Sequence, residues 1–161
     1  MQEQKSAITY LSKERFAELE KELRELKGKG RREIAFKIAE ARGHGDLSEN
    51  AEYDAAKEAQ QHLEYKIAKL EDVFSRARII NGKDLPIDKV YILAKVKLKD
   101  LIKNKIIEFK IVAQEEADFD QNKISLTSPI GKSLLGKKVK DIVDVKVPAG
   151  NLRYEILEIS R

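Results

Sequence analysis

Two carboxylates three residues apart, Asp46 and Glu49, are the side chains of this chain whose type and spacing best suit chemistry. They lie in a short acidic stretch in which Gly45 favours a turn. Carboxylate oxygens are hard ligands, and one or two of them can hold Mg²⁺ while water or phosphate fills the remaining positions. On this interpretation, a protruding carboxylate pair completes a metal site in another protein.

The same spacing also fits a helix cap. Asp46 can accept a backbone hydrogen bond at the start of a helix while Glu49 reaches back, as in a capping box. Ser48 competes for this role, and if Ser48 is the cap, Glu49 complements the helix dipole and Asp46 stays free on the turn. The residues alone leave capping and a functional carboxylate pair open.

Two long amphipathic segments flank this stretch. Apolar residues recur every three or four positions, which predicts one helix from about Lys13 to Arg42 and another from about Glu49 to Arg78. The second helix follows a coiled-coil seam with one polar member, Gln60. Because a short Gly-containing turn joins them, we expect an antiparallel hairpin roughly 45 Å long with the carboxylates at its far end.

The composition indicates a folded and highly charged protein, with 42% hydrophobic and 37% charged residues among 161. The lack of Cys excludes a disulfide framework and a Cys-ligated zinc site, and it favours a reducing compartment. The N-terminal residues are polar, and no apolar run approaches the length of a membrane span. We therefore expect a cytoplasmic protein with no membrane partner.

The charge is unevenly divided. Residues 1–82 carry sixteen basic and sixteen acidic residues, whereas residues 83–161 carry sixteen and twelve. This modest excess gives little support to duplex DNA binding. A local basic run occupies the distal half of the first helix, where the plainer interpretation is a solvated face with i,i+4 pairs. Its members are Lys27, Lys29, Arg31, Arg32, Lys37 and Arg42.

A second domain follows the helices. The helical period stops near residues 81–86, where a Gly and a Pro lie within five residues, and this predicts a domain boundary. Ser128 and Pro129 predict the start of a short helix that Gly136 closes. Alternating or β-rich runs predict strands at residues 94–99, 107–112 and 152–156, with a hairpin turn at residues 148–151.

The sequence thus predicts an α+β protein with a helical hairpin in residues 1–82 and a small, mainly antiparallel β domain in residues 83–161. No self-contained active site can be assembled. Gly131-Lys132-Ser133 has the end of a phosphate-binding loop, but Leu126 stands where that loop needs its first Gly. His44 and His62 lack the spacing of a zinc helix. We therefore do not expect an enzyme.

Residues 38–53, followed by residues 55–58, closely resemble the hairpin tip of the Gre family of bacterial transcript cleavage factors, in its GreA branch. Residues 116–119, 124–130 and 135–137 resemble the family's C-terminal domain, whose fold is similar to the FK506-binding proteins. The resemblance covers nearly the whole chain, and its domain order agrees with the order expected from the residues. It implies an FKBP-like second domain.

The resemblance also implies a function. Such factors insert the coiled coil through the secondary channel of backtracked bacterial RNA polymerase and stimulate the polymerase to cut the 3′ end of its own transcript. Asp46 and Glu49 would then hold the second Mg²⁺ jointly with the polymerase, so the chain needs no cofactor of its own. Arg42 and Lys57 would form the basic patch near the RNA 3′ end, and the C-terminal domain would dock on the polymerase rim. We expect the factor to act as a monomer.

One departure from the family pattern lies in the first helix. Many members have Arg-Pro-Glu-Ile where this chain has Arg31-Arg32-Glu33-Ile34, so we expect Gly28 and Gly30 to loosen the helix in place of a Pro-directed kink. A channel inhibitor that promotes no cleavage is the closest alternative, and the intact acidic tip argues against it. A chaperone-like module that binds peptides is the alternative from another class.

Overall fold

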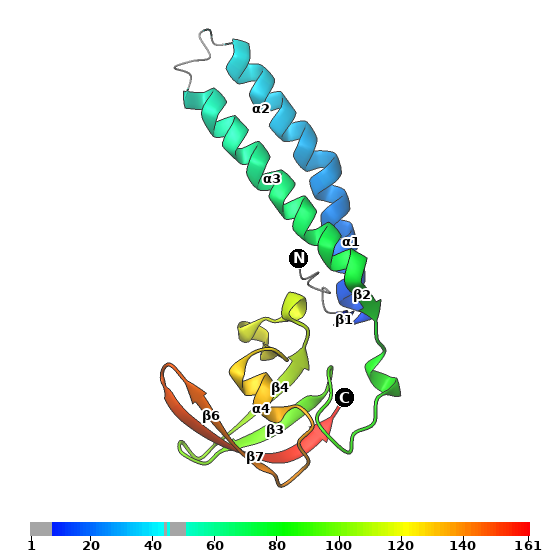
Figure 1. Cartoon of the computed structure of the whole chain (residues 1–161), viewed down its shortest axis with the longest axis vertical. Helices are drawn as coiled ribbons and strands as arrows, with labels where there is room; N and C mark the ends of the chain where they lie inside the picture. The colour runs from blue at the N-terminus through cyan, green and yellow to red at the C-terminus, as the bar shows by residue number, and fades with distance from the viewer. Residues whose placement is uncertain (1–7, 44, 46–50) are drawn as a thin grey trace, which may run out of the picture. The chain divides into compact units, whose positions relative to one another are not determined.

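Helices form the first of the two units into which the chain divides (Figure 1). The computed structural model describes residues 8–43, 45 and 51–161. Residues Phe16–Ala77 lie in the first unit, and Thr9–Arg15 lie in the second unit together with Arg78–Arg161. The first turn of the chain's first helix therefore belongs to the β-rich unit rather than to the hairpin.

The predicted helical hairpin is confirmed. Its first arm consists of α1 (Lys13–Glu25), a π-helical segment η1 (Leu26–Gly30) and α2 (Arg31–Gly43), and its second arm is α3 (Ala51–Arg76). Figure 1 shows α2 and α3 side by side over their length. The 26 residues of α3 correspond to a rod about 39 Å long, since an α-helix rises 1.5 Å per residue.

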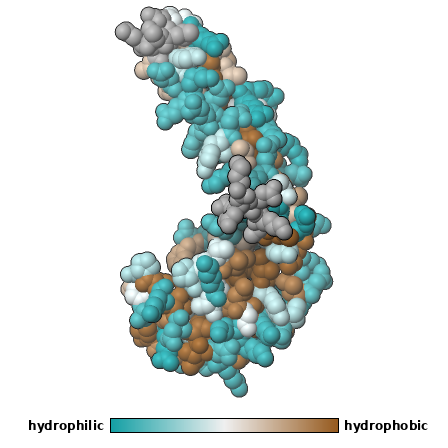
Figure 2. Space-filling view, in the orientation of Figure 1, coloured by the Kyte–Doolittle hydropathy of each residue, from teal (hydrophilic) through white to brown (hydrophobic). Residues whose placement is uncertain are grey.

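A narrow line of apolar side chains holds the two arms together. Ala56, Leu63 and Ile67 are buried on α3, where the predicted seam places them, and Ala41 is buried on α2. Near the other end of the hairpin, the rings of Phe16 and Phe74 meet edge to face with centroids 5.0 Å apart. Most other surface of the hairpin is polar, as the visible face in Figure 2 shows.

The π-helical segment lies where the sequence predicts a loosened helix. It contains Gly28 and Gly30, and a Cβ atom built on Gly30 would lie 3.1 Å from Cδ1 of Leu63. Glycine thus gives the Leu63 side chain room against the first arm. The first arm therefore departs from regular α-helix here and forms a wider, π-helical turn.

The second helix, α3, ends at Arg76, two residues before the predicted end at Arg78. Ala77–Ile79 form strand β2, which pairs with β1 (Thr9–Leu11) in a two-stranded sheet. The backbone N–H of Ile80 also donates to the carbonyl of Leu11 at 2.9 Å. β-branched residues at 79 and 80 favour this extended exit over another helical turn.

The second unit is built on a five-stranded sheet in the order β5-β4-β3-β7-β6. Its strands are β3 (Lys95–Asp100), β4 (Lys105–Val112), β5 (Lys123–Ser125), β6 (Ile142–Val147) and β7 (Gly150–Ser160). All neighbours are antiparallel except β4 and β5, which are parallel. This confirms a small, mainly antiparallel β domain of the α+β class. A register shift between Lys97 and Leu98 adds a local bend to the sheet.

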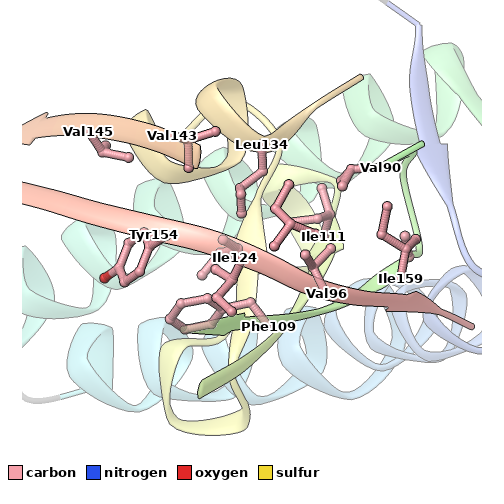
Figure 3. Close-up of a cluster of buried hydrophobic side chains, with 13 residues drawn as sticks. Val90, Val96, Phe109, Ile111, Ile124, Leu134, Val143, Val145, Tyr154 and Ile159 are labelled. Atoms are coloured by element: carbon pink, nitrogen blue, oxygen red, sulfur yellow. The ribbon is translucent and has the colours of Figure 1, made fainter. Parts of the chain in front are cut away.

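One face of the sheet carries the hydrophobic core. Leu98 on β3 and Ile156 on β7 have no exposed surface. Val96 on β3 and Leu134 of the short helix α4 (Pro129–Leu134) are equally buried (Figure 3). The intervening residues of β3 are lysines that point away from this core. The alternation of apolar and cationic residues in the sequence therefore marks the two faces of the strand correctly.

Two local predictions in this unit are confirmed. The Ser128 hydroxyl caps α4 by accepting from the N–H of Gly131 at 3.0 Å, and Gly136 follows the helix with a φ of +76°. Pro148 and Ala149 form the turn between β6 and β7, after which Gly150 takes a φ of +127°. Both glycines occupy conformations that other residues rarely adopt.

A buried carboxylate ties the first turn of α1 into the second unit. The Ser12 hydroxyl donates to Glu116 at 3.0 to 3.1 Å and accepts from the N–H of Arg15 at 3.2 Å, so it also caps α1. Glu116 is only 8% exposed. A carboxylate at a helix N-terminus is stabilised by the helix dipole.

None of the helices described is long and apolar enough to cross a membrane.

Candidate functional site

The chain reverses direction between the end of α2 at Gly43 and the start of α3 at Ala51. Gly45 has a φ of +113°, a conformation suited to the predicted Gly-containing turn. Asp46 and Glu49 lie outside the described residues, so their assignment as metal ligands or as capping residues stays a prediction.

Arg42 and Tyr53 meet where the two helices approach the turn. The guanidinium carbon of Arg42 lies 5.8 Å from the centroid of the Tyr53 ring, within the range of a cation–π contact. Arg42 stands in the last turn of α2, where a cation complements the helix dipole. The ring thus supports an exposed guanidinium close to the predicted acidic tip without neutralising its charge.

Lys57 lies on the same face of the hairpin as Arg42. Its ammonium donates to Oε1 of Gln60 at 2.7 Å, so a neutral partner orients it. Both cations line one shallow groove of about 440 Å³ between α2 and α3. The remaining lining residues are Ala35, Ile38, Ala39 and Gln60. The structure therefore brings together the two basic residues that the resemblance assigns to one patch.

The other face of the hairpin has a different character near the turn. A groove of about 400 Å³ there is lined by Lys37, Glu40 and Glu52 around four alanines of α2 and α3. These positions are about half a helical turn away from those of the first groove. Because one face carries two cations and the other mixes charges around small residues, the hairpin presents two chemically distinct sides.

Farther from the turn, the basic run forms ion pairs. Among the described residues of this run, only the pair between Lys29 and Glu33 has the i,i+4 spacing that the plainer interpretation predicts, and the pairs of Arg31 and Lys27 instead join the two arms of the hairpin. Arg31 holds Glu64 through two hydrogen bonds of 2.7 and 2.9 Å, and Lys27 contacts Glu71 at 2.5 Å. The hydrogen bonds from Arg31 hold the pKa of Glu64 below its ordinary value, and those same bonds raise the pKa of Arg31. Such exposed pairs contribute little stability. Arg42 and Lys57 differ from these residues, since the contacts that the described part of the chain shows for them are with the Tyr53 ring and with Gln60, both uncharged.

Metal ligands are the remaining requirement of the predicted chemistry. Within residues 8–43, 45 and 51–161, no group of three or more His, Asp or Glu side chains is placed to hold a metal ion. The donor set of Asp46 and Glu49 suits Mg²⁺ in chemical type, but two carboxylates supply too few ligands for a complete site. Any such site therefore needs further ligands from a partner.

Two residues near the turn were not identified as functional from the sequence. Nothing in the spacing of Tyr53 marks it as functional, although an aromatic residue close after a turn that follows Arg42 can support a cation. Gln60 was noted as the polar member of the seam, and its spacing of three residues from Lys57 was the available signal for their hydrogen bond.

Comparison with known proteins decides the family. Residues 9–79 match the model of the N-terminal domain of the transcription elongation factors, and residues 85–161 match the C-terminal model of GreA/GreB. The chain belongs to the GreA/GreB family of transcription elongation factors. The resemblance seen in the tip and in the C-terminal motifs is thereby confirmed.

Relatives within the GreA/GreB family match over almost their full length. Transcription elongation factor GreA of Chlorobium phaeobacteroides is 56% identical over 93% of this chain and 95% of the relative. GreA of Chloroherpeton thalassium is 53% identical over 94% of this chain and 96% of the relative. The crystal structure of GreA factor homolog 1 of Thermus thermophilus is 26% identical, covers 96% of this chain and 99% of that chain, and gives a TM-score of 0.44.

Proposed function

We propose that this chain is a transcript cleavage factor that enters the secondary channel of backtracked bacterial RNA polymerase and stimulates the Mg²⁺-dependent cleavage of the transcript 3′ end. One observation carries the proposal. In a member of the GreA/GreB family, the segment that joins two long helices carries Asp46 and Glu49 in its sequence, and the helix ends on either side of it bring Arg42 and Lys57 to one groove.

The dimensions of α3 support the insertion of the hairpin into a channel. A rod about 39 Å long that buries only a narrow line of side chains keeps most of its polar surface in contact with water, so it can slide into an aqueous channel without exposing a core. Its chemistry is then concentrated at the end. This arrangement suits a factor that delivers a few functional groups to another protein's active site.

Asp46 and Glu49 act in this proposal as ligands lent to the polymerase. Two-metal hydrolysis of a phosphodiester uses Mg²⁺ to activate the attacking water and to stabilise the leaving oxygen. The two carboxylates of this chain add ligands for a loosely held metal and orient the water by accepting its hydrogen bonds. The chain alone is not an enzyme in this scheme, since the polymerase supplies the rest of the site.

Arg42 and Lys57 act on the RNA. Phosphate contacts by basic side chains position nucleic acid and are independent of base sequence. The guanidinium of Arg42 supported on the Tyr53 ring, and the ammonium of Lys57 oriented by Gln60, both present positive charge toward one groove. The groove would hold the extruded 3′ end of the transcript next to the carboxylates.

The second unit supplies binding rather than chemistry. We propose that it has an FKBP-like fold and docks on the rim of the polymerase channel, and that the factor acts as a monomer in the cytoplasm. Its continuous core, its curved sheet and the helix α4 against one face make a rigid platform for such docking. No separate cofactor is required.

The test is to add the protein to a halted, backtracked bacterial elongation complex and to follow an RNA labelled at its 5′ end. Shortening of the transcript with release of short 3′ fragments, followed by renewed elongation from the new end, is expected. A channel inhibitor would bind and slow elongation without shortening the RNA, and a chaperone-like module would leave both unchanged. Either of these results would refute the proposal.

A further inference from the structure

A cluster of lysines in the second unit is not used by the proposed chemistry. It consists of Lys132 in the last turn of α4 and Lys137, Lys138 and Lys140 in the segment that leads to β6. All four residues are exposed. Residues 132–141 hold these four cations and one acid, Asp141, so they supply most of the positive excess of residues 83–161.

The cluster is presented by a rigid backbone. The N–H of Val90 donates to the carbonyl of Lys137 at 2.8 Å, and the N–H of Lys140 donates to the carbonyl of Ile156 at 2.7 Å. Asp141 accepts from the N–H of Lys138 at 2.8 Å, which occupies one oxygen of the only acidic side chain in the segment. The loop is thus fixed on both sides by neighbouring chain segments, and little backbone entropy is lost when it binds a partner.

Lys140 holds a conformation that is unfavourable for lysine. Its φ is +74°, a region that glycine adopts without cost and that other residues rarely adopt. Local strain of this kind is commonly found at functional positions. A glycine would adopt this φ without strain, so the fold alone does not explain why a lysine occupies position 140. Within the described part of the chain, none of the four lysines has a carboxylate within the 4.0 Å of an ion pair.

Apolar side chains interrupt the lysines. Leu135 and Val139 are each 43% exposed and alternate with the cations along the segment. A surface for nucleic acid would favour arginine and aromatic side chains, which stack on bases and grip phosphates in two places. Lysines mixed with exposed aliphatic residues are complementary in charge to a protein surface that mixes carboxylates with aliphatic side chains.

We infer that the segment formed by Lys132, Leu135, Lys137, Lys138, Val139 and Lys140 is a docking surface for an acidic, aliphatic segment on the surface of RNA polymerase. This inference rests on the proposed function, because it assumes that the second unit binds polymerase. It adds which surface makes the contact and which chemistry the partner presents. The lysines at the edge of this contact should accelerate association with the partner through complementary charge. Binding should therefore weaken as the salt concentration rises.

The experiment compares full-length variants of equal charge in binding to polymerase and in transcript cleavage. Lys138→Glu with Lys140→Glu reverses two charges of the cluster, and Lys103→Glu with Lys105→Glu reverses two exposed charges at the turn between β3 and β4 as the matched control. We expect the first pair to weaken binding roughly tenfold at low salt and the control pair to change it less than about twofold. At saturating protein, cleavage should return to the parental rate because the hairpin is untouched.

The single variant Lys140→Gly separates binding from folding. It removes the strained side chain, so the protein should unfold at an equal or higher denaturant concentration, yet it should bind polymerase about two- to threefold more weakly at low salt. A Lys140→Gly protein that binds as tightly as the parent would overturn the role of Lys140 even if the double variant fails to fold.

The remaining outcomes distinguish the alternatives. Equal losses in the two charge-reversed pairs would show that only net charge matters and would overturn the docking surface. A parallel loss of binding to a free RNA or duplex DNA oligonucleotide would make nucleic acid the ligand and would overturn the protein partner. If the parent itself neither binds polymerase nor promotes cleavage, the proposed function fails, whereas normal parental activity with an unaffected double variant refutes this inference alone.

Discussion

In the helical hairpin, burial is confined to one line of side chains, whereas in the second unit thirteen buried residues form a continuous cluster around the sheet and α4. The hairpin adds exposed ion pairs such as Arg31 with Glu64, which contribute little free energy. The second unit adds a buried carboxylate, Glu116, that holds the first turn of α1. The proposed chemistry and the large buried core therefore lie in different regions of the molecule.

This difference suggests a division of roles. A thin hairpin can expose functional groups at its end without a core to protect, and it can change those groups at little cost in stability. A sheet with a large core tolerates few internal changes but offers a fixed surface. If the division is real, substitutions should affect either activity or stability according to the region that holds them.

The largest effect is expected at the turn of the hairpin. Asp46→Ala or Glu49→Ala should lower stimulated cleavage by roughly 100-fold while polymerase binding is kept, because a lost metal ligand stops the chemistry in a folded protein. Asp54→Ala, which removes an acid from the first turn of α3, is the matched control and should keep cleavage. Capping predicts another result, namely normal cleavage with a loss of about 1 kcal/mol in stability.

The second effect tests whether stability is divided between the regions. Ile156→Ala should lower the opening free energy of the β3 and β7 amides by about 2–5 kcal/mol, because a fully buried side chain leaves a cavity. Leu63→Ala should instead loosen α3, where Leu63 is buried. Hydrogen exchange resolved by segment measures the opening free energy of the β3 and β7 amides and that of the α3 amides. If each substitution lowers protection equally in both regions, the hairpin and the sheet unfold together and the comparison fails.

Much of this fold could be predicted because its strongest elements carry local signals. The spacing of apolar residues predicts the seam of α3. The capping residues Ser128 and Gly136 predict the short helix α4. The loosened helix at Gly28 and Gly30 was also predicted, and it is realised as a π-helical segment. These features depend on residues within a few positions of one another.

The rest depends on residues far apart in the sequence. Strands β1 and β2 have three residues each, too few for an alternating pattern, and they exist because they pair with each other. Ser12 and Glu116 are 104 positions apart, and neither has a local pattern that indicates the contact. At the candidate site, Arg42 and Lys57 were predicted to act together, but the Tyr53 ring that supports Arg42 depends on how the two helices pair.

A smaller effect is expected on the basic face of the hairpin. Arg42→Ala with Lys57→Ala should slow cleavage about three- to tenfold at low salt, and the deficit should shrink as salt rises because the parent loses its phosphate contacts there. Crosslinking to the RNA 3′ end should fall for every transcript sequence. Lys27→Ala with Arg31→Ala removes two ion-paired cations of the same hairpin and is the matched control. An unchanged double variant at every salt concentration would remove Arg42 and Lys57 from the site.

The smallest effect concerns acid stability in the second unit. The side chain of Asp100 accepts hydrogen bonds of 2.9 Å from the backbone N–H groups of Lys103 and Ile102 and thereby fixes the turn after β3. The N–H of Lys103, followed by that of Ile102, holds the pKa of Asp100 below its ordinary value of 3.8. Because the folded state favours the ionised form, this stabilisation is complete above the unfolded pKa and is lost as the pH falls through the lower, folded one.

Asp100→Asn removes the ionisable group and keeps one acceptor oxygen. The variant should be less stable than the parent at neutral pH, because a neutral amide is a weaker acceptor than a carboxylate. The difference in unfolding free energy between the two proteins should narrow between about pH 5 and pH 2, as the Asp100 carboxylate of the parent becomes protonated. Urea unfolding across this pH range measures the difference in unfolding free energy between the variant and the parent. Hydrogen exchange of the β3 and β4 amides measures the local effect. A difference of constant size would mean that Asp100 supports the turn through shape and not through charge, and the acid sensitivity of the sheet would then have to lie in other carboxylates.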